Sequence, residues 1–310
     1  MLYIIILNWN SYKDTIDCLE SLDKNDYQDY KVILIDNASS DQSAIELKKY
    51  IQNKNNISFI ENVENSGFAK GCNIGIKIAK SNPDCNYIWL LNNDTIVSKN
   101  AIQPLIDVLA NNKSDIVTPQ INYFNPSNII WNCGGKISRL GFRKYYFDNQ
   151  DENIVPKKNL LKVTFLTNCA SMFRKEFFDE YCIDERFFFG EEDFSLSLYC
   201  KKTKKIMSCV LNSKIYHKVS VSIDSNAVKA ENKHFVYYLN RFIDMKLFFN
   251  NKFIFWLWKK IYFVYMKKLL KDKVENLSLF LNKLSYCVKN IDCVNKETFE
   301  QIMTKTYRSL

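Results

Sequence analysis

The sequence predicts an α/β protein with a mostly parallel central sheet, followed by an amphipathic helical tail. The first 120 residues alternate short β-rich runs with helical patterns, and the last 80 or so carry helical, lysine-rich patterns. Strands that alternate with helices in this way are typical of a parallel sheet with helices on both faces. The 310 residues, 47% of them hydrophobic, are enough for a large domain with a full core and a smaller part. We expect domains at about 1–225 and 226–310.

The strands and helices of the first domain follow from short apolar runs and from helical spacing of apolar residues. Strands are expected at residues 3–7, 32–35, 57–60, 87–91 and 115–118, with helices at 14–22, 43–52, 68–80, 99–110 and 175–181. Residues 120–160 have a weaker pattern, with turns at Asn125-Pro126 and Gly134-Gly135, and are expected to form an insertion. The domain is expected to end near Ser225.

Cysteines, histidines and the N-terminus indicate the compartment. The ten cysteines form no CxxC pair and lie in apolar runs, which is typical of reduced packing residues. With two histidines, a structural zinc site is not expected. The run at 4–7 has no basic segment before it and no cleavage site after it, which favours a buried strand over a signal peptide. We expect a cytoplasmic protein.

The net charge of +9 belongs to the tail. Residues 1–228 carry 27 basic and 27 acidic residues, whereas 229–310 carry 16 Lys and Arg against 7 Asp and Glu. The tail also holds 17 aromatic residues. Basic charge combined with aromatic residues suits either nucleic acid or an anionic membrane surface.

Polar residues follow the predicted strands directly, where ligands bind in parallel sheets. Asn8 and Asn10 follow the first strand, and Asn92, Asn93 and Asp94 follow the fourth. The second strand is followed by Asp36, Asn37 and Ser39, short side chains that suit a base edge or a ribose and equally an ordinary turn with a helix cap.

Asp94 is the candidate metal ligand. A carboxylate at the end of a central strand can bind a divalent cation that bridges two phosphates, although an Asp in this place also caps helices and turns. His217 could ligate the same metal through a neutral imidazole, or be a packing residue of a strand.

Three of the seven glycines lie within nine residues. Gly67, Gly71 and Gly75 are four residues apart, which places them on one helical face and allows close approach to a sheet or to a ligand. Neither a Walker phosphate loop nor a GxGxxG fingerprint is present. P-loop NTPases and typical dehydrogenases are therefore not expected.

The acidic run Glu191-Glu192-Asp193 follows an aromatic run and a glycine. Acids beside aromatic residues in a partly desolvated pocket are candidates for a general base, because burial raises the pKa of a carboxyl group. The alternative is a solvated helix start with acids in its first turn.

Taken in order, these segments resemble glycosyltransferase family 2, inverting enzymes with a Rossmann-like GT-A fold, and especially its rhamnosyltransferase-like bacterial members. The resemblance covers about residues 2–222 and rests on residues 6–10, 35–41, 65–75, 90–95 and 184–196. It implies single-displacement transfer of a sugar from a UDP- or dTDP-linked donor, dTDP-rhamnose among the candidates, to a hydroxyl of a lipid-linked glycan. The insertion at 120–160 is then on the acceptor side.

The resemblance also implies site residues. Asp193, with Glu192, resembles the catalytic base motif, and Asp94 with His217 the site of Mn²⁺ or Mg²⁺. Asn92 stands where the family has the first acid of its DxD motif. The expected donor-binding residues are Asn8, Asn10, Asp36, Asn37, Ser39, Gly67, Lys70, Asn73, Asn92 and Asn93.

The tail is not expected to span a membrane, because Lys252, Lys259, Lys260, Lys267 and Lys268 interrupt its apolar runs. On a helical wheel these lysines occupy one half-circle, and aromatic and aliphatic residues fill much of the rest. This pattern suits a helix lying on the inner face of the plasma membrane, where lipid-linked acceptors are found. The alternative is a helix packed on the core or on a second subunit.

Two other functions remain open at this point. A nucleotidyltransferase also pairs such a sheet with a carboxylate-bound metal, but releases pyrophosphate instead of a nucleoside diphosphate. A nucleic-acid-binding protein would explain the basic tail, but the charge-balanced first 228 residues offer no continuous basic groove. We therefore expect no nucleic-acid partner.

Overall fold

The computed structural model describes residues 1–219 and 227–309. They form two compact units, the first with residues 1–183 and 199–219, the second with 184–198 and the C-terminal helices. The domain boundary predicted near Ser225 lies outside the described residues. The functional division into two domains stays a prediction.

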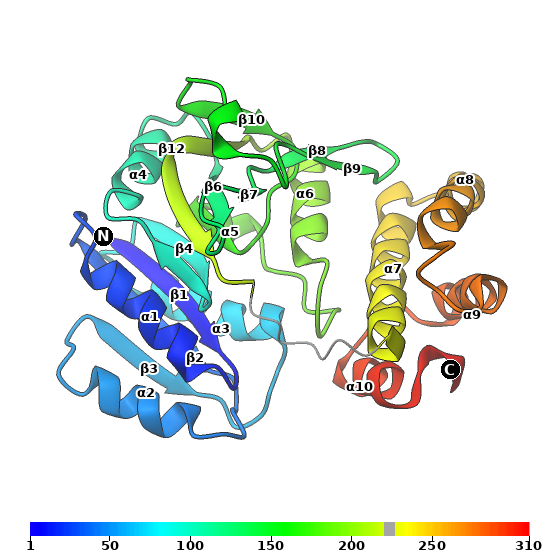
Figure 1. Ribbon diagram of the computed structural model, residues 1–310, viewed down its shortest axis with the longest axis horizontal. Helices are drawn as coiled ribbons and strands as arrows, with labels where there is room; N and C mark the ends of the chain where they lie inside the picture. The colour runs from blue at the N-terminus through cyan, green and yellow to red at the C-terminus, as the bar shows by residue number, and fades with distance from the viewer. Residues whose placement is uncertain (220–226, 310) are drawn as a thin grey trace. The chain divides into compact units, whose positions relative to one another are not determined.

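The first unit is built on a ten-stranded sheet (Figure 1) with the order β10-β12-β6-β11-β4-β1-β2-β3, to which β5 and β7 add at β12 and β6. β3, β2, β1 and β4 are parallel, and the antiparallel β11 separates β4 from β6. The strands are β1 Leu2–Asn8, β2 Tyr30–Asp36, β3 Ile57–Glu61, β4 Tyr87–Asn92, β5 Thr95–Val97, β6 Ile116–Tyr123, β7 Ile130–Asn132, β10 Leu160–Val163, β11 Ala170–Arg174 and β12 Met207–His217. β8 Gly135–Ile137 and β9 Arg143–Tyr145 form a separate hairpin.

Helices cover both faces of the parallel strands, which confirms the predicted α/β class. Leu2, Ile4 and Ile6 of β1 share a core cluster with buried residues of α1, α2 and α4. On the opposite face, α3 packs so closely that a Cβ on Gly71 or Gly75 would lie 2.6 or 2.7 Å from side-chain atoms of Leu7 or Ile5. The glycine spacing therefore serves sheet packing. The helices are α1 Tyr12–Asp23, α2 Ser43–Ile51, α3 Phe68–Ser81, α4 Ile102–Ala110 and α5 Phe177–Glu180, with the 3-10 turn η1 Glu152–Ile154.

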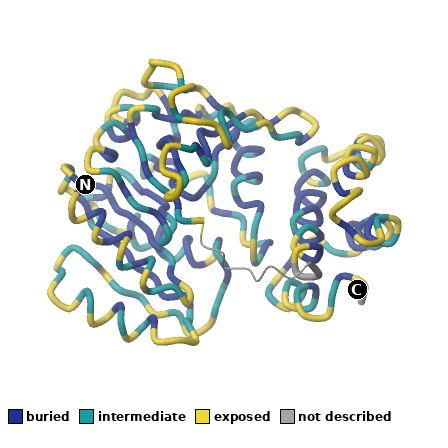
Figure 2. The backbone as a smooth tube through the Cα atoms, in the orientation of Figure 1, coloured by how far each residue is buried: buried dark blue, intermediate teal, exposed yellow. Residues whose placement is uncertain are grey.

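The second unit is helical, and α7 is its central helix. α7 contacts α8, α9 and α10, and Figure 2 shows it largely buried. The helices are α7 Ala227–Phe249, α8 Lys252–Leu270, α9 Leu277–Asn290 and α10 Lys296–Lys305, followed by the turn η2 Tyr307–Ser309. α6 Glu192–Thr203 contributes residues to both units. Among the described residues, no helix is both long and apolar enough to cross a bilayer.

α8 shows which of its faces is packed. Trp258, Tyr262, Met266 and Leu270 follow one another at four-residue spacing and are buried. This buried face includes two of the aromatic residues, Trp258 and Tyr262, that were expected on the side of the helix opposite the lysines. On the remaining surface, Phe253 and Val264 are each 70% exposed. One face of α8 is therefore packed on α7 within its own unit, and a second apolar stripe stays exposed. Packing on the catalytic core or on a second subunit stays a prediction.

Candidate active site

The carboxyl ends of β1, β2 and β4 bring the predicted polar residues together. In the parallel register Asn8 lies opposite Asp36, and Leu7 lies opposite Asn92. Residues far apart in the sequence therefore meet at one edge of the sheet, as the alternation of strands and helices predicted.

Asn8, Asp36 and Ser39 form one hydrogen-bonded group. Asn8 Nδ2 donates to Asp36 Oδ1 at 2.7 Å, and the Ser39 hydroxyl donates to the same oxygen at 2.6 Å. The Ser39 amide donates to Asp36 Oδ2 at 2.9 Å. Asn8 and Asp36 are 0% and 1% exposed. The carboxylate thus holds the loop after β2 in place, and Ser39 also accepts a hydrogen bond from the exposed Asn10 amide.

Asn37 fastens the loop between β3 and α3. Its Oδ1 accepts hydrogen bonds from Asn62 Nδ2 at 3.0 Å and from the Ser66 hydroxyl at 3.1 Å, and its Nδ2 donates to the Gly67 carbonyl at 3.2 Å. Gly67 has a φ of 81°, a left-handed conformation that favours glycine, and α3 begins directly after it. Asn37 and Gly67 are thus neighbours, and their role in donor binding stays a prediction.

The two predicted donor residues within α3 differ in their surroundings. Lys70 is exposed. The Asn73 side chain instead bonds both backbone groups of Ile183, donating to the carbonyl at 2.9 Å and accepting from the amide at 3.2 Å. The place of both residues in donor binding stays a prediction.

Thr15 links two strand ends and was missed by the sequence reasoning. Its hydroxyl donates to Asn8 Oδ1 at 2.7 Å and accepts from Asn93 Nδ2 at 2.9 Å. Thr15 is fully buried on the inner face of α1. The signal was present, because Thr15, Cys18 and Leu22 share helical spacing.

Asp94 and His217 meet because β5 pairs antiparallel with β12. Thr95 lies opposite His217, which places Asp94 beside the imidazole, with Asp94 Oδ1 and His217 Nε2 3.0 Å apart. Their side chains are 15% and 8% exposed. The Trp131 ring lies edge-on to the imidazole at 4.4 Å. The Nδ1 atom of His217 is buried and has no hydrogen-bond partner among the described residues.

The donor set of this pair suits a divalent cation, because a carboxylate oxygen and a neutral imidazole nitrogen are both common metal ligands. Across residues 1–219 and 227–309, no group of three or more His, Cys, Asp and Glu lies together as a metal cage. Oxygens of a bound phosphate ligand and water would complete the coordination, as is usual for Mg²⁺.

The acidic turn, Glu191 to Asp193, lies at the start of α6, and its three carboxyl groups have different surroundings. Glu191 is 3% exposed and forms a bidentate ion pair with Arg241, at 2.9 and 3.0 Å. Glu192 is 8% exposed, its Oε1 accepts from the Gly190 amide at 3.0 Å, and burial raises the pKa of its carboxyl group to about 8. Asp193 is only half-buried. Of the three, Asp193 is therefore the most accessible to a substrate.

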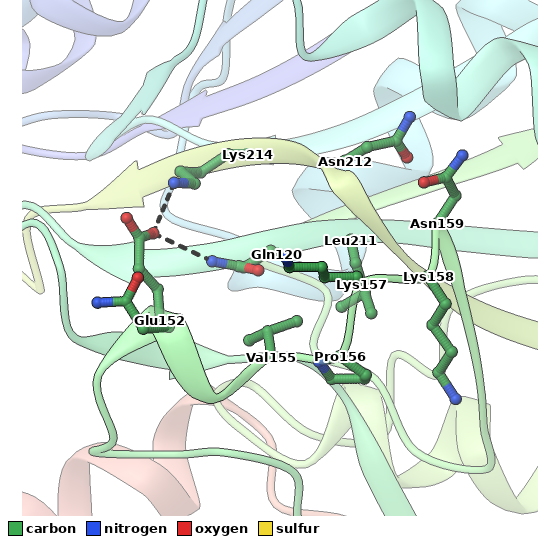
Figure 3. Close-up of a pocket in the computed structure, with 11 residues that line it drawn as sticks. Gln120, Glu152, Val155, Pro156, Lys157, Lys158, Asn159, Leu211, Asn212 and Lys214 are labelled. Atoms are coloured by element: carbon green, nitrogen blue, oxygen red, sulfur yellow. Dashed lines mark hydrogen bonds and ion pairs between the residues drawn. The ribbon is translucent and has the colours of Figure 1, made fainter.

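A polar cavity of about 420 Å³ lies elsewhere in the first unit (Figure 3). It opens where the β6–β12 pairing shifts register between Val210 and Lys214. Lys214 Nζ and Gln120 Nε2 both reach Glu152 Oε2, at 2.5 and 3.4 Å. None of the predicted site residues lines it.

Comparison with known protein families shows which family the chain matches. The model of the family "Glycosyl transferase family 2" matches residues 3–182, more than half of the chain. The match ends before the acidic turn, so Glu192, Asp193 and His217 lie beyond it.

Two characterised relatives are glycosyltransferases. Glycosyltransferase GlyG of Streptococcus pneumoniae serotype 4 is 27% identical over 125 residues, 40% of this chain and 40% of the relative. Bifunctional glycosyltransferase pgtA of Dictyostelium discoideum is 24% identical over 201 residues, 58% of this chain and 25% of the relative. The chain thus spans less than half the length of either relative.

A solved structure shares the fold. The crystal structure of GalNAc-T7 with UDP, GalNAc and Mn²⁺ aligns with a TM-score of 0.59 and 16% identity, over 93% of this chain and 57% of that chain.

Proposed function

Because the chain belongs to glycosyltransferase family 2, with a GT-A fold, we propose that it inverts the anomeric centre of a UDP- or dTDP-linked sugar on transfer to a glycan. dTDP-rhamnose is among the candidate donors, and the acceptor is a hydroxyl of a growing, lipid-linked bacterial surface glycan. Family membership favours a glycosyltransferase over a nucleotidyltransferase and over a nucleic-acid-binding protein.

The observation that carries the donor side of the proposal is the pairing of Asp94 with His217 near the carboxyl ends of the parallel strands. When bound there, a divalent cation such as Mn²⁺ or Mg²⁺ would neutralise charge on the departing diphosphate. The loop that follows β2, which Asn8 and Asp36 hold in place by hydrogen bonds, lies at the same sheet edge and is the proposed site of the nucleoside part of the donor.

On the acceptor side, Asp193 is the general base. Its carboxylate accepts the proton of the acceptor hydroxyl while that oxygen bonds to the anomeric carbon of the donor sugar. The bond from this carbon to the diphosphate oxygen breaks in the same step, so the configuration inverts and no covalent enzyme intermediate forms. Glu192 is protonated near neutral pH, because burial raises the pKa of its carboxyl group to about 8. It therefore adds little negative charge beside the base.

The exposed stripe of α8 is the proposed membrane contact. Phe253, Leu257 and Val264 are 47 to 70% exposed, on the side away from the buried stripe. At 100° per residue, Lys260 and Lys267 flank this stripe on one side and Lys268 on the other. Apolar residues between lysines suit the boundary between acyl chains and anionic headgroups. We place the protein peripherally on the inner face of the plasma membrane; a second copy of the chain is the alternative occupant.

Substitution of the base tests the proposed reaction. In Asp193→Asn we expect transfer to fall by about 10² to 10⁴, because no carboxylate accepts the hydroxyl proton. UDP and dTDP affinity, measured by titration calorimetry, should not change. The measurement is nucleoside diphosphate release from a panel of UDP- and dTDP-sugars with a glycan acceptor. Glu185→Gln, which removes an exposed acid of the same segment, is the matched control. Turnover of Asp193→Asn close to that of this control would contradict the assignment.

A further inference from the structure

Residues 184–195, which include the acidic turn, lie on α7 within the second unit. The side chains of Asn240, Arg241 and Asp244 of α7 contact this segment. Arg241 and Asp244 are three residues apart and therefore share one face of the helix. The role inferred for this face rests on the proposed function, since it concerns the placement of Asp193.

Arg241 holds the segment at Glu191, two residues before the proposed base. The Glu191 side chain is 0% exposed and that of Arg241 is 6% exposed. The guanidinium donates through Nε and Nη2 to both carboxylate oxygens, and through Nη1 to the Tyr262 hydroxyl of α8 at 2.8 Å. Its carbon centre also lies 4.9 Å from the Phe194 ring centroid. Arg241 thus contacts both chain neighbours of the pair Glu192-Asp193.

Asp244 holds the segment on both sides of the acidic turn. The Asp244 carboxylate accepts a hydrogen bond from Arg186 Nη2 at 2.6 Å and one from the Ser195 hydroxyl at 2.6 Å. Asp244 is 4% exposed. Arg186 precedes the three acids and Ser195 follows them. The turn is therefore tied to α7 at its two ends and at Glu191.

Asn240 completes the attachment at the turn itself. Its Nδ2 donates to the carbonyls of Phe189 and Gly190, at 3.0 and 3.2 Å. Gly190 and Glu191 have φ of 85° and 71°, and for a residue other than glycine this left-handed conformation costs about 1 kcal/mol or more. The contacts from α7 offset the cost of this conformation at Glu191.

A stability role alone does not account for this arrangement. Buried ion pairs contribute little net stability compared with apolar residues of similar volume, because desolvation offsets the attraction. Their better attested effect is to select one geometry. Here the selected geometry is that of residues 189–195, with Asp193 at the first turn of α6.

We propose that Arg241 and Asp244 are positioning residues that set the place of the Asp193 carboxylate by fixing the acidic turn on α7. The C-terminal helices then contribute to turnover and not only to a surface contact.

The test uses a double variant that removes the ion pair without leaving a buried charge, so that an effect on the position of Asp193 can be told from a loss of stability. Glu191→Gln combined with Arg241→Met removes both charges together, so neither is left buried without its partner. We expect this double variant to stay folded and to bind UDP or dTDP as wild type does. Amide hydrogen exchange of residues 187–194 should be about tenfold faster, as for a locally loosened segment. The kcat for nucleoside diphosphate release should fall about 10- to 100-fold with an unchanged KM for the donor, because small displacements of a catalytic group cost this much.

Arg241→Lys provides the conservative comparison. It keeps the charge and loses the two-point contact, so kcat should lie between those of wild type and the double variant. Tyr307→Phe is the matched control, because it removes a buried hydrogen bond to Glu231 in the same unit, away from the acidic turn. It should lower the unfolding temperature and leave both kcat and the exchange of 187–194 unchanged.

The outcomes are distinct. If exchange of 187–194 in the double variant equals that of wild type, or if Tyr307→Phe lowers kcat equally, positioning by α7 is wrong. If Asp193→Asn is as active as wild type, the proposed base is wrong, whatever the exchange shows. If no nucleotide sugar is turned over by wild type, the exchange measurement still decides whether α7 fixes the turn.

Discussion

At the scale of single residues, three consecutive acids have three different environments. Glu191 is paired, Glu192 is buried without a basic partner among its described contacts, and Asp193 is half-buried. A run of acids in a sequence predicts a cluster of charge but not this division, because the left-handed turn at Gly190 and Glu191 directs neighbouring side chains apart. Choosing among the three requires the structure.

Burial of the Glu192 carboxyl group makes the free energy of unfolding depend on pH. Its pKa is raised from 4.5 to about 8 by burial, with the nearby Asp193 and Glu191 charges adding to the effect. Between these values the folded state keeps the proton that the unfolded state releases, so stability falls as pH rises from about 4.5 to about 8. The Glu192→Gln variant has no carboxyl group to titrate at this position, so its stability should not show this decrease with rising pH.

The measurement is the unfolding temperature of both proteins across that pH range. The difference, variant minus wild type, should increase by several degrees as pH rises. Asp244, whose pKa burial raises to about 7, titrates in both proteins and cancels in the comparison. Parallel curves would mean that Glu192 is ionised in the folded protein near neutral pH.

Asp94→Ala tests the metal pair. We expect UDP or dTDP to bind at least about tenfold more weakly in the presence of Mn²⁺, a loss of about 1.4 kcal/mol, because His217 alone holds a cation poorly. Titration calorimetry with and without Mn²⁺ measures this. Asp107→Asn, an exposed acid on α4, is the control. Equal affinities for the Asp94→Ala variant and this control would remove the metal from the proposed site.

Part of this site could be predicted from residues alone. Asn8, Asp36 and Asn92 follow strands of one parallel sheet, and their convergence is a consequence of that topology. The contact of Asp94 with His217, 123 residues later, depends on an antiparallel pairing of the three-residue strand β5. A strand of three residues is too short to show the alternation of apolar and polar residues by which strands are predicted from sequence.

At the scale of elements, α8 shows what a helical wheel can and cannot decide. The five lysines do lie within one half-circle, as their spacing predicts. However, the helix carries two apolar stripes, and periodicity cannot tell which one packs inward. Trp258 and Tyr262 pack against Phe242 of α7, which leaves the stripe with Phe253 exposed.

Neutralising lysines tests the exposed stripe as a membrane contact. Lys260, Lys267 and Lys268 are exposed, whereas Lys259 is half-buried and contacts Ser285. Changing the three exposed lysines to Gln should weaken binding to anionic liposomes about a hundredfold at moderate salt, at about 1 kcal/mol each. Cosedimentation with vesicles that contain phosphatidylserine measures the change.

A control with the same net charge separates local contact from overall charge. Lys113, Lys157 and Lys158 are exposed lysines of the first unit, and changing them to Gln should leave liposome binding nearly unchanged. Equal losses in both triple variants would show that α8 is not the contact. If wild type is a dimer in solution and Phe253→Asp makes it monomeric, a second copy of the chain covers the stripe instead.

At the scale of the whole molecule, the elements of the first 123 residues and the helical C-terminal part were predictable, and the strands between them were not. The expected strands and helices of residues 1–123 all occur, with ends shifted by a few residues. Beyond them, β7, β8 and β9 have three residues each, and antiparallel β11 lies between β4 and β6. Such short strands are specified by long-range pairing more than by local pattern.

The course of the chain through its two units sets an order on biosynthesis. Phe187 and Phe194 are 1% and 0% exposed, and the Phe187 backbone pairs with Val294. A ribosome adds about 5 to 20 residues per second, so roughly 5 to 20 s pass between the synthesis of Phe187 and that of Val294, about a hundred residues later. During this interval the aromatic segment before the proposed base is without the helices that cover it. In this order of synthesis, the proposed base obtains its final surroundings only after α9 and Val294 have been made.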